Sequence, residues 1–136
     1  LILIYIKEIK IILSIFLIVL LVLYLLLIDM DKIYYPYKAT DGKHKFFIIT
    51  NQGKKINFGS AINKDYTIYY KEYGKDIAYK KRNAFLARHS KLNEKWGIDG
   101  INTAGWWSRF LLWEYPTIEE AYKYIKIDLK KNGYLR

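Results

Sequence analysis

The sequence predicts an α+β protein, in which an N-terminal transmembrane helix precedes a small domain of a β-hairpin and about three short helices. Three features predict this fold: an uncharged apolar run at 11–28, two β-branched and aromatic segments separated by turn residues, and several capped, periodic segments in the second half. We expect three parts: an N-terminal segment at 1–31, a tether at 32–45 and a basic, aromatic-rich domain at 46–136.

The apolar run at 11–28 has the length and composition of a membrane span. Its 18 residues carry no charge, and a helix of this length reaches about 27 Å, close to the thickness of a bilayer's hydrocarbon core. Its apolar character extends all round the helix, whereas a helix lying on a membrane surface would have a polar face. The residues expected to anchor the chain in lipid are Ile11, Phe16, Leu20, Tyr24 and Ile28.

Two other interpretations of this run remain open, a cleaved signal peptide and a buried core helix. Asp29-Met30-Asp31 is a poor cleavage site, and the remaining chain is too small to cover a helix on every side. Two lysines precede the run and four follow it closely, at positions 32, 38, 43 and 45. This bias favours a cytosolic location for the C-terminal domain.

The excess of positive over negative charge lies entirely after residue 31. Of 23 Lys and Arg and 13 Asp and Glu residues, only two and three lie in 1–31, which leaves 21 against 10 in 32–136. The chain has no cysteine, so a disulfide framework, a thiolate metal site and a cysteine nucleophile are excluded. About 105 residues remain after the apolar run, enough for a core of ordinary size.

The first part of the domain is expected to form a β-hairpin. Residues 46–50 (FFIIT) and 55–58 are β-branched and aromatic, and the Asn51-Gln52-Gly53-Lys54 segment between them is typical of a turn. Pro36 and Gly42 interrupt 32–45, which favours a tether. The Tyr-rich stretch 59–74 is expected to be irregular.

Three helices are expected after this stretch. Asp76 is a candidate cap for a helix ending near Lys91. After a glycine-containing loop at 96–102, Thr103 is a candidate cap for a single helix ending at Trp113. Thr117-Ile118-Glu119-Glu120 has the pattern of a capping box. It precedes an apolar stripe formed by Ile118, Ala121, Tyr122, Ile125 and Leu129, before a terminator at Gly133.

The aromatic residues near position 107 divide into expected core and expected contact residues. On a regular helix, Trp106, Phe110 and Trp113 share one face, which favours the core, whereas Trp107 is displaced by about 100°. Trp107 is therefore a candidate for an exposed partner contact, since Trp contributes strongly to interfaces. Arg109 could lie across an aromatic face.

Catalysis, cofactor binding and metal binding have little support in the sequence. His89 could act as an acid or base, but the spacing indicates no carboxylate partner, and the other histidine, His44, falls in the expected tether. Two distant histidines do not form a metal-ligand cluster, and Gly97-Ile98-Asp99-Gly100 lacks a phosphate-loop pattern. We therefore expect a protein that is not an enzyme, with no catalytic, cofactor-binding or metal-binding residues.

The basic surface is the strongest functional feature after the apolar run. Positive charge of this kind can attract anionic lipid headgroups, nucleic acid or an acidic protein, and a merely solvated surface is the plain alternative. No recognised nucleic-acid motif is present. The residues that we expect to contact a partner are Trp107, Arg109, Arg88, Lys80, Lys81 and Arg82.

A series of short motifs is distributed over residues 55–122. In order, they are Asn57-Phe58-Gly59, Asp65-Tyr66-Thr67, Lys80-Lys81-Arg82, Ala87-Arg88-His89, Glu94-Lys95-Trp96, the run TAGWWSRFLLW at 103–113, and Pro116-Thr117. This order resembles an uncharacterised family of short basic proteins of nucleocytoplasmic large DNA viruses, the giant viruses of protists and algae. The run at 103–113 is its most specific part. Where the family pattern often continues Asp-Tyr-Thr with a His-Lys run, this chain has Ile68-Tyr69-Tyr70-Lys71, which removes one candidate polar site.

The resemblance implies a viral product and a virion component, and the family offers no catalytic residues to carry over. Such viruses assemble an icosahedral shell over an internal membrane. We therefore expect a membrane-anchored minor capsid or virion structural protein that links the inner membrane to the capsid shell. Its basic domain would face the shell, and before assembly it would lie on the cytosolic face of host membranes. The alternative is a membrane-tethered nucleic-acid-binding protein.

Overall fold

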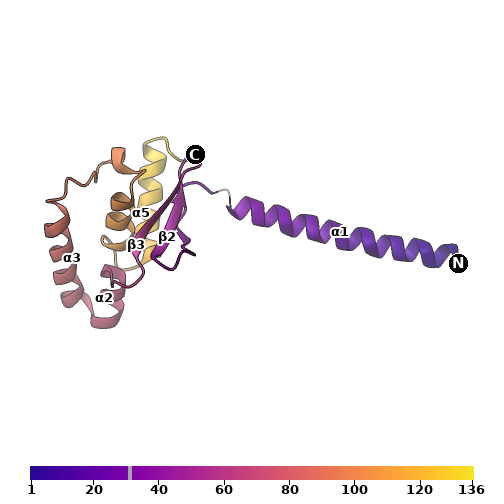
Figure 1. Ribbon diagram of the computed structural model, residues 1–136, viewed down its shortest axis with the longest axis horizontal. Coiled ribbons are helices and arrows are strands. Elements are labelled where there is room, and N and C mark those ends of the chain that lie inside the picture. The colour runs from indigo at the N-terminus through magenta and orange to yellow at the C-terminus, as the bar shows by residue number, and fades with distance from the viewer. Residues whose placement is uncertain (31) are drawn as a thin grey trace. The chain divides into compact units, whose positions relative to one another are not determined.

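The chain forms two compact units. The computed structural model describes residues 1–30 and 32–136, with side chains described outside 28–31. The first unit is Leu1–Ile33 and the second is Tyr34–Arg136. The architecture is α+β, with a long N-terminal helix and, in the second unit, a small sheet with helices on one side of it (Figure 1).

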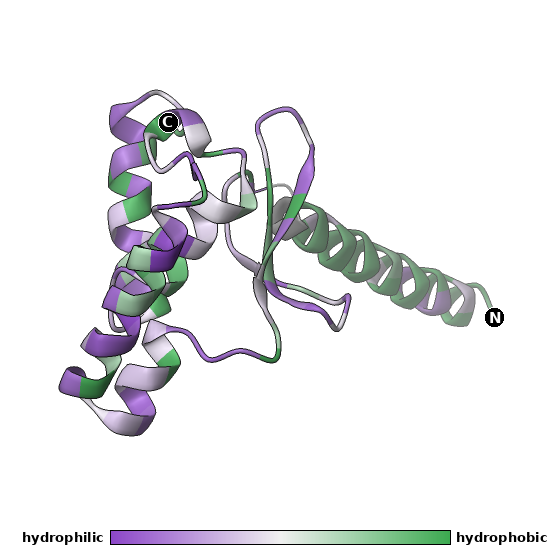
Figure 2. Ribbon diagram, turned by 60° about the vertical axis from the view of Figure 1, so that its left-hand side comes forward, coloured by the Kyte–Doolittle hydropathy of each residue, from purple (hydrophilic) through white to green (hydrophobic). Residues whose placement is uncertain are grey.

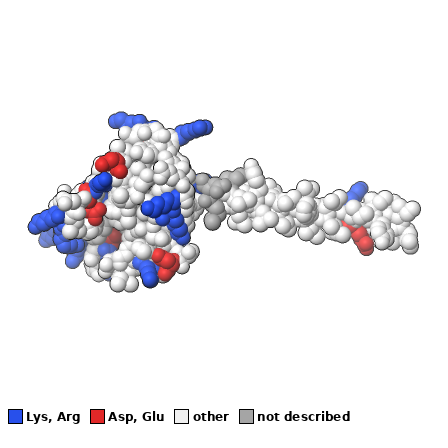
Figure 3. Space-filling model, turned by 45° about the horizontal axis from the view of Figure 1, so that its top comes forward, with Lys and Arg blue, Asp and Glu red and all other residues white. Residues whose placement is uncertain are grey.

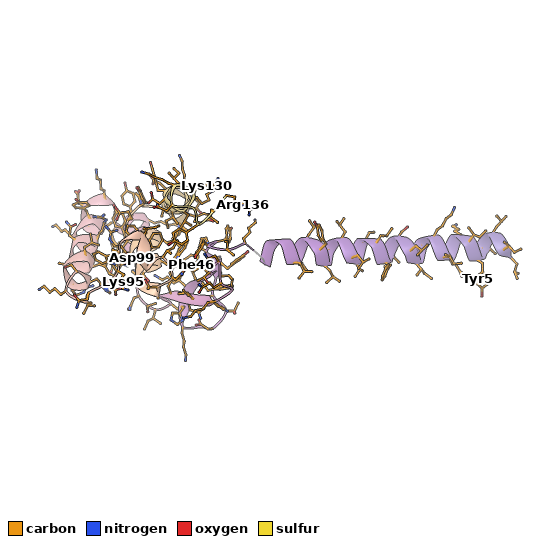
Figure 4. The ribbon with its side chains drawn as sticks, turned by 90° about the horizontal axis from the view of Figure 1, so that it is seen from above. Tyr5, Phe46, Lys95, Asp99, Lys130 and Arg136 are labelled. Atoms are coloured by element: carbon orange, nitrogen blue, oxygen red, sulfur yellow. The ribbon has the colours of Figure 1, made fainter. Side chains whose placement is uncertain are left out.

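Helix α1 (Ile2–Met30) is longer than the predicted span. Its segment from Ile2 to Leu27 is long and apolar enough to cross a membrane, and none of its most apolar window is buried in the protein. The apolar colouring of Figure 2 continues along the helix, and Figure 4 shows side chains projecting on all sides, Tyr5 among them. This exposure contradicts the core-helix interpretation. A signal sequence, like a membrane span, has this length and composition.

The residues expected to anchor the chain are exposed wherever the structure describes them. Ile11, Phe16, Leu20 and Tyr24 each have about half or more of their surface accessible. The side chain of Ile28 lies outside the described residues. An exposed apolar helix of this length satisfies its own backbone hydrogen bonds, as a hydrocarbon environment requires.

The second unit contains a three-stranded antiparallel sheet with strand order β1-β2-β3. Strands β2 (His44–Ile49) and β3 (Lys55–Ser60) form the predicted hairpin, with Ile48 opposite Ile56. In the turn, the Thr50 hydroxyl accepts hydrogen bonds from the amides of Gln52 and Lys54.

The predicted tether at 32–45 is mostly part of the domain, so this prediction is wrong from Tyr34 onward. Strand β1 (Tyr37–Lys38) pairs with β2, which itself begins at His44. Tyr34 is fully buried, and its hydroxyl donates hydrogen bonds toward Asn51 and Asn102, at 3.1 and 2.9 Å from their side-chain oxygens. The segment is ordered because it extends the edge of a sheet and contributes an aromatic ring to the core.

Four α-helices follow the sheet: α2 (Tyr66–Tyr73), α3 (Lys75–His89), α4 (Ala104–Trp107) and α5 (Ile118–Lys131). A 3₁₀ turn forms at Ile98–Gly100, and α4 continues into a π-helical turn at Ser108–Leu112. Helix α4 packs on β3, and the π-helical turn packs on α5 and β3. Figure 1 shows α3 on the side of α4 away from the sheet.

Local capping explains where these helices begin. The predicted caps Thr103 and Thr117 are confirmed, since their hydroxyls accept hydrogen bonds from the amides of Trp106 and Glu120. The prediction of irregular structure at 59–74 is wrong, because the Asp65 carboxylate caps α2 by accepting from the amides of Thr67 and Ile68.

Two further helix predictions are corrected. Asp76 does not cap α3: Gly74 lies at the junction with φ of 85°, and Asp76 falls in the first turn, where its charge favours the helix dipole. The segment 104–113 is not one regular α-helix, because the π-helical turn places an additional residue in its second half.

Trp107 is at the centre of the core, so its predicted exposure is wrong. The side chain is fully buried, and its indole N–H donates a 2.8 Å hydrogen bond to the carbonyl oxygen of Ile101. Its ring stacks with Tyr34 at 6.4 Å between centroids and lies 5.9 Å from Phe58. Short helix α4 is covered on more than one side, so a residue displaced by 100° from one buried face still meets the core.

The other aromatic predictions in this region have mixed outcomes. Trp106 is buried as expected, whereas Phe110 and Trp113 are only half-buried. Arg109 lies over aromatic rings as predicted, with its guanidinium 5.4 Å from the Trp96 centroid and 5.1 Å from the Phe110 centroid.

We predict that Trp107→Ala will destabilise the domain by about 4 kcal/mol, because it removes a large buried ring and leaves a cavity. Urea unfolding of the full chain in detergent, followed by near-ultraviolet circular dichroism, would measure the change. Leu92, which is exposed, provides the control: Leu92→Ala should change stability by less than about 0.5 kcal/mol. Equal effects of the two substitutions would contradict the placement of Trp107.

We predict that Gly100→Ala will destabilise the domain by about 3 kcal/mol, because its new methyl group would overlap the backbone carbonyl of Lys95. Gly53 has φ of 77° and open space around its Cβ position, so Gly53→Ala should cost only about 1 kcal/mol of backbone strain. The same unfolding measurement compares the two variants, and a larger loss in Gly53→Ala would be inconsistent with this packing.

Candidate functional site

Helix α3 carries the most concentrated positive charge in the domain. It contains five Lys or Arg residues and one acidic residue, Asp76. Lys75, Lys80, Lys81 and Arg88 are exposed on it. In Figure 3, Lys and Arg side chains crowd the left-hand edge of the domain, where Figure 1 places α3.

One face of α3 lines a polar cleft of about 700 Å³. Lys81, Ala84, Phe85, Arg88 and His89 contribute to its wall. These positions are separated by three, one, three and one residues, the spacing that places side chains on one helix face. The cleft therefore presents two cations, a small residue and two rings from a single helix.

The remaining wall comes from segments distant in sequence. The end of β3 contributes Gly59, the loop before α2 contributes Lys64 and Asp65, and α4 contributes Gly105. The π-helical turn adds Ser108, which directly follows the buried Trp107. The tertiary fold thus joins segments that are distant in sequence around one concave surface.

Two lysines of the cleft are already paired. Lys45 Nζ lies 2.6 Å from Asp65 Oδ2, in a contact with little solvent exposure. Lys64 Nζ lies 2.6 Å from Glu72 Oε2 and 3.0 Å from the Tyr73 hydroxyl. The hydrogen bond to Glu72, and to a smaller extent the one to Tyr73, raises the pKa of Lys64 above its usual range. This lysine therefore keeps its charge at neutral pH.

His89 has a carboxylate neighbour that its sequence context did not indicate. Nδ1 of His89 lies 3.6 Å from Oε1 of Glu94, five residues later in the chain. The imidazole stacks on Phe85 at 4.0 Å between centroids, and Phe85 stacks in turn on Trp113 at 4.3 Å. The ring is therefore fixed between an aromatic stack and an acidic group at the edge of the cleft.

Glycine at position 105 allows Glu94 to reach this place. A Cβ atom at Gly105 would overlap the carboxylate of Glu94. The Glu94 carboxylate can occupy this place because position 105 has no side chain. Gly105 therefore leaves room for the Glu94 carboxylate in the wall of the cleft.

Arg82 and Arg109, both predicted to contact a partner, are paired inside the domain. The Glu114 carboxylate accepts from Nη2 of Arg82 at 2.9 Å and also from Nη1 of Arg109. Nε of Arg82 donates to the Trp113 carbonyl at 2.8 Å. Burial lowers the pKa of Arg109 to about 10, with a smaller contribution from the positive charge of Arg82. Arg109 still carries its charge at neutral pH.

The predicted contact residues therefore separate into two groups. Lys80, Lys81 and Arg88 are exposed together on α3. Arg82 and Arg109 stabilise the domain through Glu114, and Trp107 is in the core, so these three residues do not form an accessible surface with the others.

Sequence reasoning missed most of the cleft. Four residues of the cleft wall belong to the motifs that carry the viral resemblance, and the sequence indicated no other role for them: Gly59, Asp65, Glu94 and Gly105. What the sequence does not show is that these four residues converge in space. No spacing along the chain could reveal it, because the motifs lie on different elements.

Neither a protein-family model, nor a curated protein, nor a solved structure matches this chain. Within the described part of the chain, no group of His, Asp and Glu residues has an arrangement that could hold a metal ion. The function must therefore be inferred from α1, the charged face of α3 and the cleft.

We predict that Glu114→Gln will destabilise the domain by about 3 kcal/mol, because two largely buried guanidinium groups would lose their shared carboxylate. Thermal unfolding of the full chain in detergent would measure the loss. The exposed Glu119, in the first turn of α5, provides a control with the same charge change, and Glu119→Gln should cost less than about 1 kcal/mol. A loss no larger in Glu114→Gln would contradict the pairing.

Proposed function

We propose that this protein is a membrane-anchored minor capsid or virion structural protein that links the inner membrane of a large DNA virus to its capsid shell. One observation supports this above all: an exposed apolar helix of membrane-spanning length is joined directly to a compact, basic domain. The resemblance of residues 55–122 to a viral family supplies the virion context.

In this proposal α1 inserts in the inner membrane and the domain lies on the side that faces the shell, which is cytosolic before assembly. Lys80, Lys81 and Arg88 form the contact with an acidic surface of a shell protein. Opposite charges across such a contact favour association and orientation. Because the anchor confines the domain near the shell, a weak contact is sufficient for stable attachment. The role is structural and requires no catalytic group.

The density of exposed cations on α3 supports an electrostatic contact over an apolar one. Lys75, Lys80, Lys81 and Arg88 lie on one helix, whereas the large rings of Trp106 and Trp107 are buried. The proposed partner contact therefore consists of the exposed cations of α3 and does not include Trp107, which is buried.

We predict that the chain will remain with the capsid shell when purified particles are stripped of lipid by a mild nonionic detergent. Particles carrying Lys80→Gln, Lys81→Gln and Arg88→Gln together should release it, because the proposed contact loses three charges. Mass spectrometry of the membrane, shell and genome fractions would measure its distribution.

The matched control is the triple variant Lys123→Gln, Lys130→Gln and Lys131→Gln, which removes three exposed charges from α5. It should remain with the shell. Release of the unaltered chain with the lipid would contradict the link, and its recovery with the genome would favour the nucleic-acid alternative. Extraction of the chain from membranes by alkaline carbonate would contradict the anchor itself.

A further inference from the structure

We propose that the cleft beside α3 binds a phosphate group, carried by a soluble molecule or by a lipid headgroup, with Arg88 and Lys81 as its principal ligands. The site lies wholly within the Tyr34–Arg136 unit. The proposal therefore does not depend on the membrane anchor or on a shell partner.

The first support is the availability of these two cations. Lys45 and Lys64, which also line the cleft, have carboxylate partners. Within the described part of the chain neither Arg88 nor Lys81 has an ion pair, and Nζ of Lys81 lies over the ring of Tyr69 at 5.4 Å from its centroid. Positive charge directed at a concave surface without a counter-charge is suited to an anionic ligand.

The second support is the geometry of α3. Lys81 and Arg88 are seven residues apart, so their backbones are separated by about 10 Å along one helix face. Ala84 lies between them and also lines the cleft. Its methyl side chain leaves the space between the two cations open, and their long side chains can reach a group that lies over Ala84.

The third support is the charge balance of the opposite wall. Asp65 is fully engaged: Oδ1 accepts from the amides of Thr67 and Ile68, and Oδ2 pairs with Lys45. Glu94 is the other carboxylate in the wall, and its Oε1 lies 3.6 Å from Nδ1 of His89, which offsets the carboxylate charge only when the imidazole is protonated. An anion in the cleft would therefore meet one carboxylate, Glu94, opposite the two cations of α3.

A phosphate group fits this arrangement better than a carboxylate. It carries a charge of about −1.5 to −2 and has three terminal oxygens that accept hydrogen bonds from different directions. A carboxylate accepts within one plane, as in a single bidentate arginine contact. The two unpaired cations here are separated along α3, which favours a ligand that accepts hydrogen bonds from several directions.

The test uses the full chain in nonionic detergent, labelled with nitrogen-15 and titrated with inorganic phosphate at constant ionic strength. We expect saturable shifts of the backbone amides of Ala84 and Gly105, together with the Nε–H of Arg88. Arg88→Gln and Lys81→Gln should each weaken binding about tenfold, since each removes a charged hydrogen-bond donor. Glu94→Gln should strengthen binding because it removes a negative charge from the wall.

Lys80→Gln is the matched control. Lys80 is the same residue type on the same helix and is exposed, but it does not line this cleft. Its substitution changes the net charge as Lys81→Gln does, so a general electrostatic attraction predicts equal effects. The proposed site predicts less than about a twofold change for Lys80→Gln. Equal losses in the two variants, or shifts that do not saturate, would overturn the proposal.

A second arm distinguishes the source of the phosphate. The chain is placed in phosphatidylcholine nanodiscs with or without phosphatidylinositol 4-phosphate, and the same resonances are followed. Shifts that require this lipid would support the site with a headgroup as ligand, whereas shifts produced only by added inorganic phosphate would support it with a soluble ligand. Failure of the chain to enter nanodiscs would count against the proposed anchor, while the detergent titration would still decide the phosphate site.

Discussion

The buried indole of Trp107 is the contact on which the arrangement of the domain depends. Its ring meets Tyr34 from the segment before the sheet and Phe58 from β3, and its N–H is bound by the carbonyl of Ile101. Helix α4 has only four residues, too few to be stable alone, so tertiary packing must hold it. Because α4 also carries Gly105, the same core contact that orders α4 positions one wall of the cleft.

The charges of the domain are divided between internal pairing and exposure. Glu114 joins two arginines from α3 and the π-helical turn, and Asp65 joins Lys45 to the start of α2. These pairs connect elements distant in sequence, and leaving either partner unpaired would be costly at such low exposure. The cations of α3 that remain exposed are consequently those able to attract an outside partner, whether a protein surface or a phosphate group.

Local chemistry predicted several elements well. The hairpin of β2 and β3 followed from residue type and turn composition, and the caps Thr103 and Thr117 followed from the residues after them. Two of the failures have a common cause. Strand β1 exists because it pairs with β2, and Trp107 is buried because several segments surround α4. Neither circumstance can be read from a window of neighbouring residues, since both depend on long-range packing.

The sequence by itself determined the apolar character of α1, the excess of positive charge after residue 31 and the absence of cysteine chemistry. It also determined that Lys81 and Arg88 share a helix face, because that follows from helical periodicity. Only the tertiary structure decided that this face meets Gly105 and Glu94 across a cleft. Periodicity specifies the faces of one element, whereas the packing of buried side chains between elements determines which faces come together.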